Sequence, residues 1–259
     1  MILDELAEST RKRVAKKKEK ISLEEIKEKA LMMEKTKDFP FEQALKKEGL
    51  SIIAEVKKAS PSKGIIAADF PYLEIAKEYE ASGVNAISCL TEPEYFKGSD
   101  DYLRDIAKEV RIPVLRKDFT VDPYMIYEAK TLGASAILLI AAILSDKELK
   151  EYYEIAESLG LSALFEAHDE EEVKRCLALG ARIVGVNNRN LKDFTVDINN
   201  SIRLRELIPE DVIYVSESGI KTPEDLKILK ENGTDAVLIG EMFMRSENKK
   251  ELIESLHKI

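Results

Sequence analysis

The feature that most constrains this chain is an alternation, repeated eight times after residue 50, between short apolar runs and segments with helical periodicity. Strands and helices that alternate in this way predict parallel strands joined by right-handed crossovers. The helical segments carry start signals, such as the capping-box pattern Ser145–Glu148 and the cap–proline pairs Asp122–Pro123 and Thr222–Pro223. The expected strands are Ser51–Val56, Asn85–Leu90, Ile112–Leu115, Ser135–Ile140, Ser162–Phe165, Arg182–Val186, Val212–Val215 and Asp235–Ile239.

Two architectures accommodate such an alternation, a doubly wound open sheet and a closed barrel. The continuous apolar runs indicate a sheet that is buried on both faces, which suits either one. Eight near-equal units in about 200 residues close more naturally into a barrel. The G-x-G-x-x-G fingerprint of an open dinucleotide-binding sheet is absent. We therefore predict an α/β protein with a (β/α)8 TIM barrel over residues 51–259.

Residues 1–50 are predicted to be a helical extension that packs on the barrel within one overall domain. Two helices are expected there, because Ser22–Glu25 has the capping-box pattern that opens a second helix running to about Thr36. The run Arg11–Lys20 is strongly basic, as in an arm that binds nucleic acid. A solvated helix face is the favoured interpretation because acidic residues follow the run. Salt-sensitive binding to DNA or RNA would indicate an interaction protein, and none is expected.

Composition narrows the possible partners and locations. The net charge of −9, from 40 basic and 49 acidic residues, disfavours nucleic acid as the main partner. No apolar stretch approaches the roughly 18 residues that cross a bilayer, so no membrane is expected. The acidic segment Met1–Thr10 lacks the apolar core of a signal peptide. We expect a cytoplasmic protein, and a monomer.

The few cysteines and histidines limit the chemistry. Cys89 and Cys176 are expected to be small buried hydrophobes, and no Cys/His spacing would hold zinc. His168 is expected to hydrogen-bond behind a site, and His257 to lie on the surface. Acid/base chemistry must therefore rest mainly on carboxylates and lysines, with no metal or cofactor.

Polar residues gather where the predicted strands end, which is where barrels of this kind carry their active sites. Period-two alternation places Glu55 and Lys57 on one face of the first strand. The same parity puts Lys117, Glu166 and Glu217 above inward-facing apolar columns. Salt-bridged structural supports are the competing interpretation for each residue alone. For two lysines and three glutamates at one mouth, mutual pKa perturbation suited to acid/base catalysis is favoured.

Glycines after the last two strands indicate an anion site. Gly219 follows the seventh strand and Gly240 follows the eighth, where barrels commonly bind phosphate through backbone N–H groups. Arg189 and Lys57 would add positive charge, whereas the carboxylate of Glu241 would have to point away. These residues predict an enzyme that acts on a small phosphorylated substrate.

Five ordered blocks of the chain resemble those of the indole-3-glycerol phosphate synthase family, from tryptophan biosynthesis. The resemblance covers nearly the whole chain, including the N-terminal helical extension. It implies a carboxy-lyase that closes the ring of 1-(2-carboxyphenylamino)-1-deoxyribulose 5-phosphate with loss of carbon dioxide and water. The blocks are Ile53–Ser62, Leu115–Phe119, Leu164–His168, Gly185–Leu191 and Ser216–Ile220.

The resemblance also implies catalytic roles. Lys117 would be the general acid that protonates the substrate carbonyl, so that the aromatic carbon can attack it. Glu55, Glu166 or Glu217 would stabilise the positive charge that ring closure creates. Glu166 would also be the base of the dehydration. Lys57 would either be the acid of that second step or hold the anionic groups of the substrate, and the sequence leaves both open.

The resemblance also implies which residues contact the substrate. Asn187 and Ser218 would position hydroxyls or the carboxylate by hydrogen bonds. The phosphate or polar end would be held by Ser60, Arg189, Gly219 and Gly240, and the aryl ring would lie among Pro61, Phe96 and Phe119. For each aromatic residue, ordinary packing is the competing interpretation. The resemblance suggests that the N-terminal helices also close over the site.

Two other functions compete with this one. Phosphoribosylanthranilate isomerase is a phosphate-binding barrel of the same pathway, but it uses a Cys/Asp pair and generally lacks the long extension. A non-catalytic sensor of a phosphorylated metabolite would keep the phosphate glycines and lose Lys117 or Glu166, and both are present here.

Overall fold

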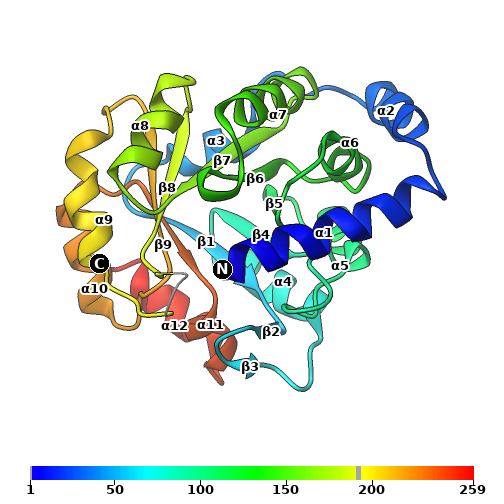
Figure 1. The fold of residues 1–259 in the computed structure, drawn as a ribbon. Coiled ribbons are helices and arrows are strands. Elements are labelled where there is room, and N and C mark those ends of the chain that lie inside the picture. The colour runs from blue at the N-terminus through cyan, green and yellow to red at the C-terminus, as the bar shows by residue number, and fades with distance from the viewer. Residues whose placement is uncertain (1, 191–193) are drawn as a thin grey trace.

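The protein is described by a computed structural model over residues 2–190 and 194–259, so Leu191 of the fourth sequence block lies outside the described residues. Within these ranges, eight parallel strands form a closed barrel in the order β1-β10-β9-β8-β7-β6-β5-β4 (Figure 1). The strands are β1 (Ser51–Val56), β4 (Ala86–Leu90), β5 (Val114–Lys117), β6 (Ala136–Ile140), β7 (Ser162–Ala167), β8 (Ile183–Asn187), β9 (Ile213–Glu217) and β10 (Ala236–Ile239). The (β/α)8 prediction is confirmed.

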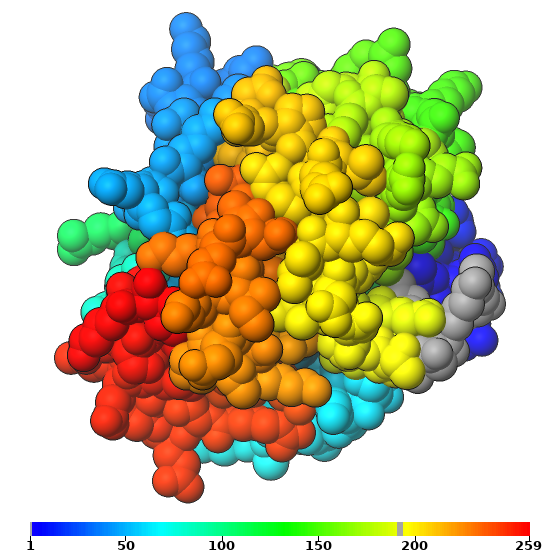
Figure 2. Space-filling model, turned by 90° about the vertical axis from the view of Figure 1, so that its left-hand side faces the viewer, coloured from blue at the N-terminus to red at the C-terminus, as the bar shows by residue number. Residues whose placement is uncertain are grey.

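Helices follow the strands and surround the barrel (Figure 1). Helices begin at the predicted capping residues: Ser145 and Glu148 form a reciprocal capping box at α7, and Thr222 and Asp225 form another at α10. The α-helices are α4 (Tyr72–Ala81), α5 (Asp100–Glu109), α6 (Pro123–Thr131), α7 (Asp146–Ser158), α8 (Glu170–Ala178), α9 (Asn199–Leu204), α10 (Pro223–Glu231), α11 (Glu241–Arg245) and α12 (Lys249–Leu256), with 3-10 helices η1 (Ala141–Ile143) and η2 (Arg205–Leu207). Figure 2 shows the face covered by the last third of the chain, coloured yellow to red.

Alternate residues of each strand face two different apolar cores, one inside the barrel and one between the barrel and the helices. Ile53, Leu115 and Leu164 belong to the core inside the barrel, whereas Ile52 and Val56 pack outward against the helices. The next inward-facing residues of β1, β5 and β7 are Glu55, Lys117 and Glu166. The apolar interior therefore ends in charged groups at the carboxyl end of the barrel. Cys89 and Cys176 are buried in the outer core, as predicted.

Several strands extend further than their apolar runs. β5 ends at Lys117, β7 at Ala167, β8 at Asn187 and β9 at Glu217, two residues later than predicted in each case except for the one-residue extension of β8. The backbone ladder continues through these residues because its hydrogen bonds do not depend on side-chain polarity. The candidate catalytic side chains therefore stand on strands, which orient them more firmly than loops would.

The N-terminal segment contains three helices rather than the two predicted: α1 (Ile2–Lys18), α2 (Leu23–Met32) and α3 (Pro40–Leu45). α2 begins at the predicted capping box but ends at Met32, short of Thr36. α3 escaped prediction because Phe39 precedes it in a left-handed conformation, with φ of 44°, and supplies no side-chain cap. Phe41 and Leu45 of α3 pack into the inner core.

Ion pairs connect α1 to the barrel. Arg13 donates to both carboxylate oxygens of Asp118, at 2.7 and 2.9 Å. Lys17 pairs with Asp100 and Glu128, and both of these acids also bind the buried guanidinium of Arg116. Part of the basic run Arg11–Lys20, most of which lies in α1, is therefore paired with acidic residues of this chain.

A short hairpin between β1 and α4 was not predicted. It pairs β2 (Ala59–Ser60) with β3 (Gly64–Ile65) in antiparallel fashion. Its two-residue strands are too short to produce a pattern in the sequence. Among the described helices, none combines the length and apolarity that a membrane crossing requires.

Candidate active site

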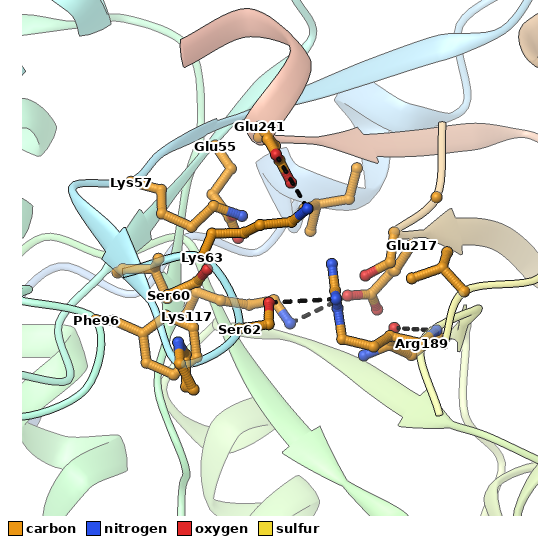
Figure 3. A pocket seen from close by; sticks show the side chains of 18 of the residues that line it. Glu55, Lys57, Ser60, Ser62, Lys63, Phe96, Lys117, Arg189, Glu217 and Glu241 are labelled. Carbon is orange, nitrogen blue, oxygen red and sulfur yellow. Dashed lines mark hydrogen bonds and ion pairs between the residues drawn. The ribbon is translucent and has the colours of Figure 1, made fainter. Parts of the chain in front are cut away.

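A cavity of about 650 Å³ opens at the carboxyl ends of the strands. Its walls come from α1, the β2–β3 hairpin, the strand ends and the loops that follow them. Figure 3 shows side chains that line it. All the residues predicted for the site line this one cavity: Glu55, Lys57, Ser60, Pro61, Phe96, Lys117, Phe119, Glu166, Asn187, Arg189, Glu217, Ser218, Gly219 and Gly240.

Lys117 stands between two carboxylates at the floor of the cavity. Its Nζ lies 2.9 Å from Oε2 of Glu166 and 3.0 Å from Oε2 of Glu217. Burial alone would lower the pKa of Lys117, but the charges of Glu166, Glu217 and Glu55 outweigh burial and raise it above its ordinary value. Lys117 is therefore a buried ammonium group that is protonated at neutral pH.

The two carboxylates beside Lys117 differ in their protonation. Burial, together with the nearby charges of Glu166 and Glu55, outweighs the opposing effect of Lys117 and raises the pKa of Glu217 to about 7. For Glu166, the opposite balance holds, because Lys117 and His168 together overcome burial and lower its pKa. When their surroundings push the pKa values of two carboxyl groups apart, one group can serve as an acid and the other as a base.

Gly185 makes room for Glu217. It lies in β8, paired with both Glu166 and Val215, and a Cβ at this position would collide with the Glu217 carboxylate. Gly185 had no predicted role. A glycine inside an apolar strand was the available signal, since it often marks close approach of another group.

A second lysine–glutamate pair lies beside the first. Nζ of Lys57 is 2.6 Å from Oε1 of Glu55, and both side chains are largely buried. Gly240 packs against this pair, because a Cβ there would lie 2.5 Å from Oε1 of Glu55 and 2.8 Å from Nζ of Lys57. Close packing with Lys57 and Glu55 is thus a reason for glycine at position 240 besides any contact with phosphate.

The turn after β9 has the backbone shape of an anion site. Ser218 and Gly219 both have positive φ, 67° and 86°, which turns their N–H groups away from the strand direction. Buried Asn188 holds this turn, since its Nδ2 donates to the Ser218 carbonyl at 3.0 Å and to Oγ of Ser216 at 3.0 Å. Sequence reasoning gave Asn188 no role, although it lies next to Asn187.

Basic side chains border the same end of the cavity. Arg189 donates to Oγ of Ser62 at 3.3 Å, and Lys63 points to Glu241 at 3.9 Å (Figure 3). The carboxylate of Glu241 also accepts from Arg245 at 2.9 Å. Glu241 is therefore paired with cations of its own surroundings.

An apolar slot lies opposite the anion end. The rings of Phe96 and Phe119 have centroids 6.1 Å apart, and Pro61, Leu3 and Leu6 also line the cavity. α1 thus forms part of the wall, which the helical pattern of α1 could not show.

Buried Glu92 holds the loop that carries Phe96. Its carboxylate accepts the backbone N–H groups of Glu94, Tyr95 and Phe96 at 2.7 to 2.9 Å. Glu92 was not predicted either, because hydrogen bonds to the backbone leave no spacing pattern in a sequence.

Substitution of Glu217 by glutamine tests the raised pKa. A carboxyl whose pKa rises on folding stabilises the fold fully below its unfolded pKa, and this stability is lost as pH rises through about 7. We expect the stability of Glu217→Gln relative to wild type to increase by on the order of 3 kcal/mol between pH 4.5 and pH 8. Denaturant unfolding across this range measures it, with exposed Glu210→Gln as control. A difference independent of pH would contradict the prediction.

Substitution of Arg13 by methionine tests the role of α1. It would leave the buried Asp118 carboxylate without its closest cation and lower the free energy of unfolding by about 2–3 kcal/mol. Because Leu3 and Leu6 line the cavity, we expect KM to rise more than kcat falls. Lys12→Met removes an exposed charge from the same helix and should change stability by less than about 0.5 kcal/mol. An unchanged KM in Arg13→Met would mean that α1 serves stability alone.

The assembled cavity suits acid/base chemistry on an aromatic anion. It joins a protonated lysine, carboxylates of different pKa, an apolar slot and an anion-binding turn. Cys89, the cysteine available near a strand end, is buried in the outer core and does not line the cavity. This placement disfavours the isomerase alternative, whose chemistry needs a Cys/Asp pair.

Known proteins resemble the chain over nearly its full length. A family model described as indole-3-glycerol phosphate synthase matches residues 3–256. The indole-3-glycerol phosphate synthase of Ruminiclostridium cellulolyticum is 58% identical over 95% of both chains, and that of Lacticaseibacillus paracasei is 53% identical over 98% of this chain and 97% of the relative. Among solved structures, 3-hexulose-6-phosphate synthase from Salmonella typhimurium has a TM-score of 0.66 at 11% identity, covering 81% of this chain and 97% of its own, which shows a shared fold.

Proposed function

The chain belongs to the indole-3-glycerol phosphate synthase family, and from that premise we propose a mechanism for its cavity, with Lys117 as the acid and Glu166 as the base. The enzyme is a carboxy-lyase that makes indole-3-glycerol phosphate. Its substrate is 1-(2-carboxyphenylamino)-1-deoxyribulose 5-phosphate. The observation that carries the proposal is the position of Lys117 Nζ, 2.9 Å from Glu166 and 3.0 Å from Glu217.

Lys117 supplies the proton for ring closure. The aromatic carbon that bears the carboxylate attacks the carbonyl carbon, and the carbonyl oxygen takes a proton from the Lys117 ammonium. The nitrogen lone pair feeds this attack, so positive charge develops on the nitrogen. The carboxyl groups of Glu55, Glu166 and Glu217 face this charge, and because all three are buried, their electrostatic stabilisation of it is strong.

Decarboxylation and dehydration complete the reaction. Carbon dioxide leaves with its bonding electrons returning to the ring, which restores aromaticity and neutralises the nitrogen. The hydroxyl then departs as water with a proton from an acid, and Glu166 removes a proton from the carbon next to the nitrogen. Lys57 is placed to be that acid or to hold the substrate carboxylate, because it lines the cavity beside Glu55.

The remaining residues orient the substrate. Asn187 donates to Oε1 of Glu166 at 3.2 Å, so it holds the base as well as facing the cavity. Ser218 and Gly219 offer backbone N–H groups to the phosphate, with Ser60, Arg189 and Gly240 beside them. Pro61, Phe96 and Phe119 enclose the aryl ring. Residues 1–50 pack on the barrel as an extension whose first helix walls the cavity.

We also propose that the protein works in the cytoplasm as a monomer. A phosphorylated substrate stays in the compartment where it is made, because its charge prevents passage through a bilayer. The cavity is assembled from one chain. Light scattering after size exclusion would measure the oligomeric state.

Product formation tests the function directly. The chain has no tryptophan, so the indole fluorescence of the product rises over a low protein background. Purified protein mixed with the substrate should form product and release one carbon dioxide for each molecule of product. Binding without product would favour the sensor alternative.

A further inference from the structure

His168 lies behind Glu166, on the side away from Lys117. Its Nε2 is 3.4 Å from Oε1 of Glu166, and its Nδ1 is 3.1 Å from Oε2 of Glu172 on α8. The same Glu172 oxygen accepts the backbone N–H of His168 at 2.7 Å, and Asn200 of α9 donates to the His168 carbonyl at 3.0 Å. The imidazole thus lies between carboxylates of β7 and α8, and the backbone of His168 is held from α8 and α9.

The two ring nitrogens both face carboxylate oxygens, which selects one protonation state. In neutral imidazole one nitrogen carries a proton and the other carries a lone pair. With Nδ1 donating to Glu172, the lone pair of Nε2 would point at the negative oxygen of Glu166. Only the doubly protonated ring carries a proton on the nitrogen that faces each carboxylate. Within the described residues, the buried Nε2 makes no hydrogen bond, so its contact with Glu166 at 3.4 Å is an ion pair.

The charges around His168 favour this cation. Glu166 on β7, Glu172 on α8 and Glu217 on β9 all face it, and Lys117 on β5 is the opposing cation, on the far side of Glu166. Burial lowers the pKa of His168, but the hydrogen bond with Glu172 and the charges of Glu166 and Glu172 raise it above its ordinary value.

The two oxygens of the Glu166 carboxylate therefore have different partners. Oε2 accepts from Lys117, whereas Oε1 accepts from Asn187 at 3.2 Å and faces His168. A base that swings between rotamers loses its alignment with the proton it removes. Contacts on both oxygens fix the plane of the carboxylate.

We propose that His168 and Glu172 are positioning residues for Glu166: Glu172 holds the imidazole as a cation, and the cation keeps Glu166 ionised and oriented for proton removal. This inference rests on the proposed role of Glu166 as base. Neither His168 nor Glu172 lines the cavity, so both act through Glu166.

The charge state of His168 is measured without reference to activity. The chain contains two histidines, His168 and His257, so nitrogen-15 imidazole spectra of His257→Gln report His168 alone. We expect both ring nitrogens of His168 to be protonated at pH 7. A neutral ring at pH 7 would overturn the proposal, whatever the role of Glu166.

The pH profile tests the positioning. In His168→Gln the amide can still donate to Glu166, but the positive charge is gone, so the acid limb of kcat/KM should move up by about one pH unit. Glu172→Gln should move it in the same direction by less, and the double variant no further than His168→Gln alone. Glu170→Gln removes a similar charge from the exposed side of α8 and should leave the profile unchanged.

The outcomes separate the possible failures. A uniform loss of kcat at every pH in His168→Gln, with lower thermal stability, would mean that His168 contributes only packing and would overturn the proposal. Persistence of the acid limb in Glu166→Gln would instead refute Glu166 as the titrating base, and the nitrogen-15 result would then decide the charge of His168 independently.

Discussion

Replacement of Lys117 by methionine should lower kcat by about 10²–10⁴-fold, the range associated with loss of a positioned general acid. Methionine keeps much of the volume and removes the proton. The loss should appear in kcat rather than KM, because the carbonyl oxygen needs the proton only as the carbon–carbon bond forms. Indole fluorescence under single-turnover conditions measures the ring-forming chemistry apart from product release.

Buried Lys130 supplies the matched control for Lys117. Its Nζ donates to the Glu34 backbone carbonyl at 2.8 Å, outside the cavity. Lys130→Met therefore removes a buried ammonium group without touching the site, and kcat should stay near the wild-type value. If Lys117→Met kept more than about a tenth of wild-type kcat, Lys117 would not be the acid.

Replacement of Glu166 by glutamine should lower kcat by about 10²–10⁴-fold as well, because an amide cannot accept the proton lost in dehydration. Glutamine keeps the shape and retains a carbonyl oxygen for Lys117. Since ring closure and decarboxylation precede the step that needs this base, carbon dioxide should be released faster than indole product appears. Quenched samples analysed for carbon dioxide and for indole would resolve the two events.

Glu217→Gln serves as the comparison for Glu166→Gln. The pKa of Glu217 is raised to about 7, so its carboxyl is already partly neutral at neutral pH and glutamine mimics that form. Its loss of kcat should be smaller than that of Glu166→Gln. Equal losses, or carbon dioxide and indole falling together in Glu166→Gln, would contradict the assignment of Glu166 as the dehydration base.

Local patterns were enough to predict the barrel and the parity of its strands. Apolar runs mark strands because a sheet covered on both faces needs continuous apolar side chains. Capping boxes such as Ser145–Glu148 act over one helical turn, so they are readable in any sequence. Glu55 and Lys57 share a face because side chains alternate along a strand, which is also a local property.

Local patterns failed where short elements lack a periodic signal. The helix α3 begins after Phe39 in a left-handed conformation without a side-chain cap, and the β2–β3 hairpin has only two residues in each strand. Neither element is long enough for a hydrophobic period to appear. For α3, contacts of Phe41 and Leu45 with the inner core supply the stability that propensity does not.

Neighbouring residues along the chain specify the eightfold barrel and the residue types that face its mouth, because strand period and helix caps are local properties. How those residues interact depends on the folded barrel. Closure of the barrel brings Lys117 to Glu166, 49 residues later, and places Gly185 against Glu217 and Glu172 behind His168. Protonation at the site follows from these distances and from burial, since Coulomb interactions depend on separation in space and not along the chain.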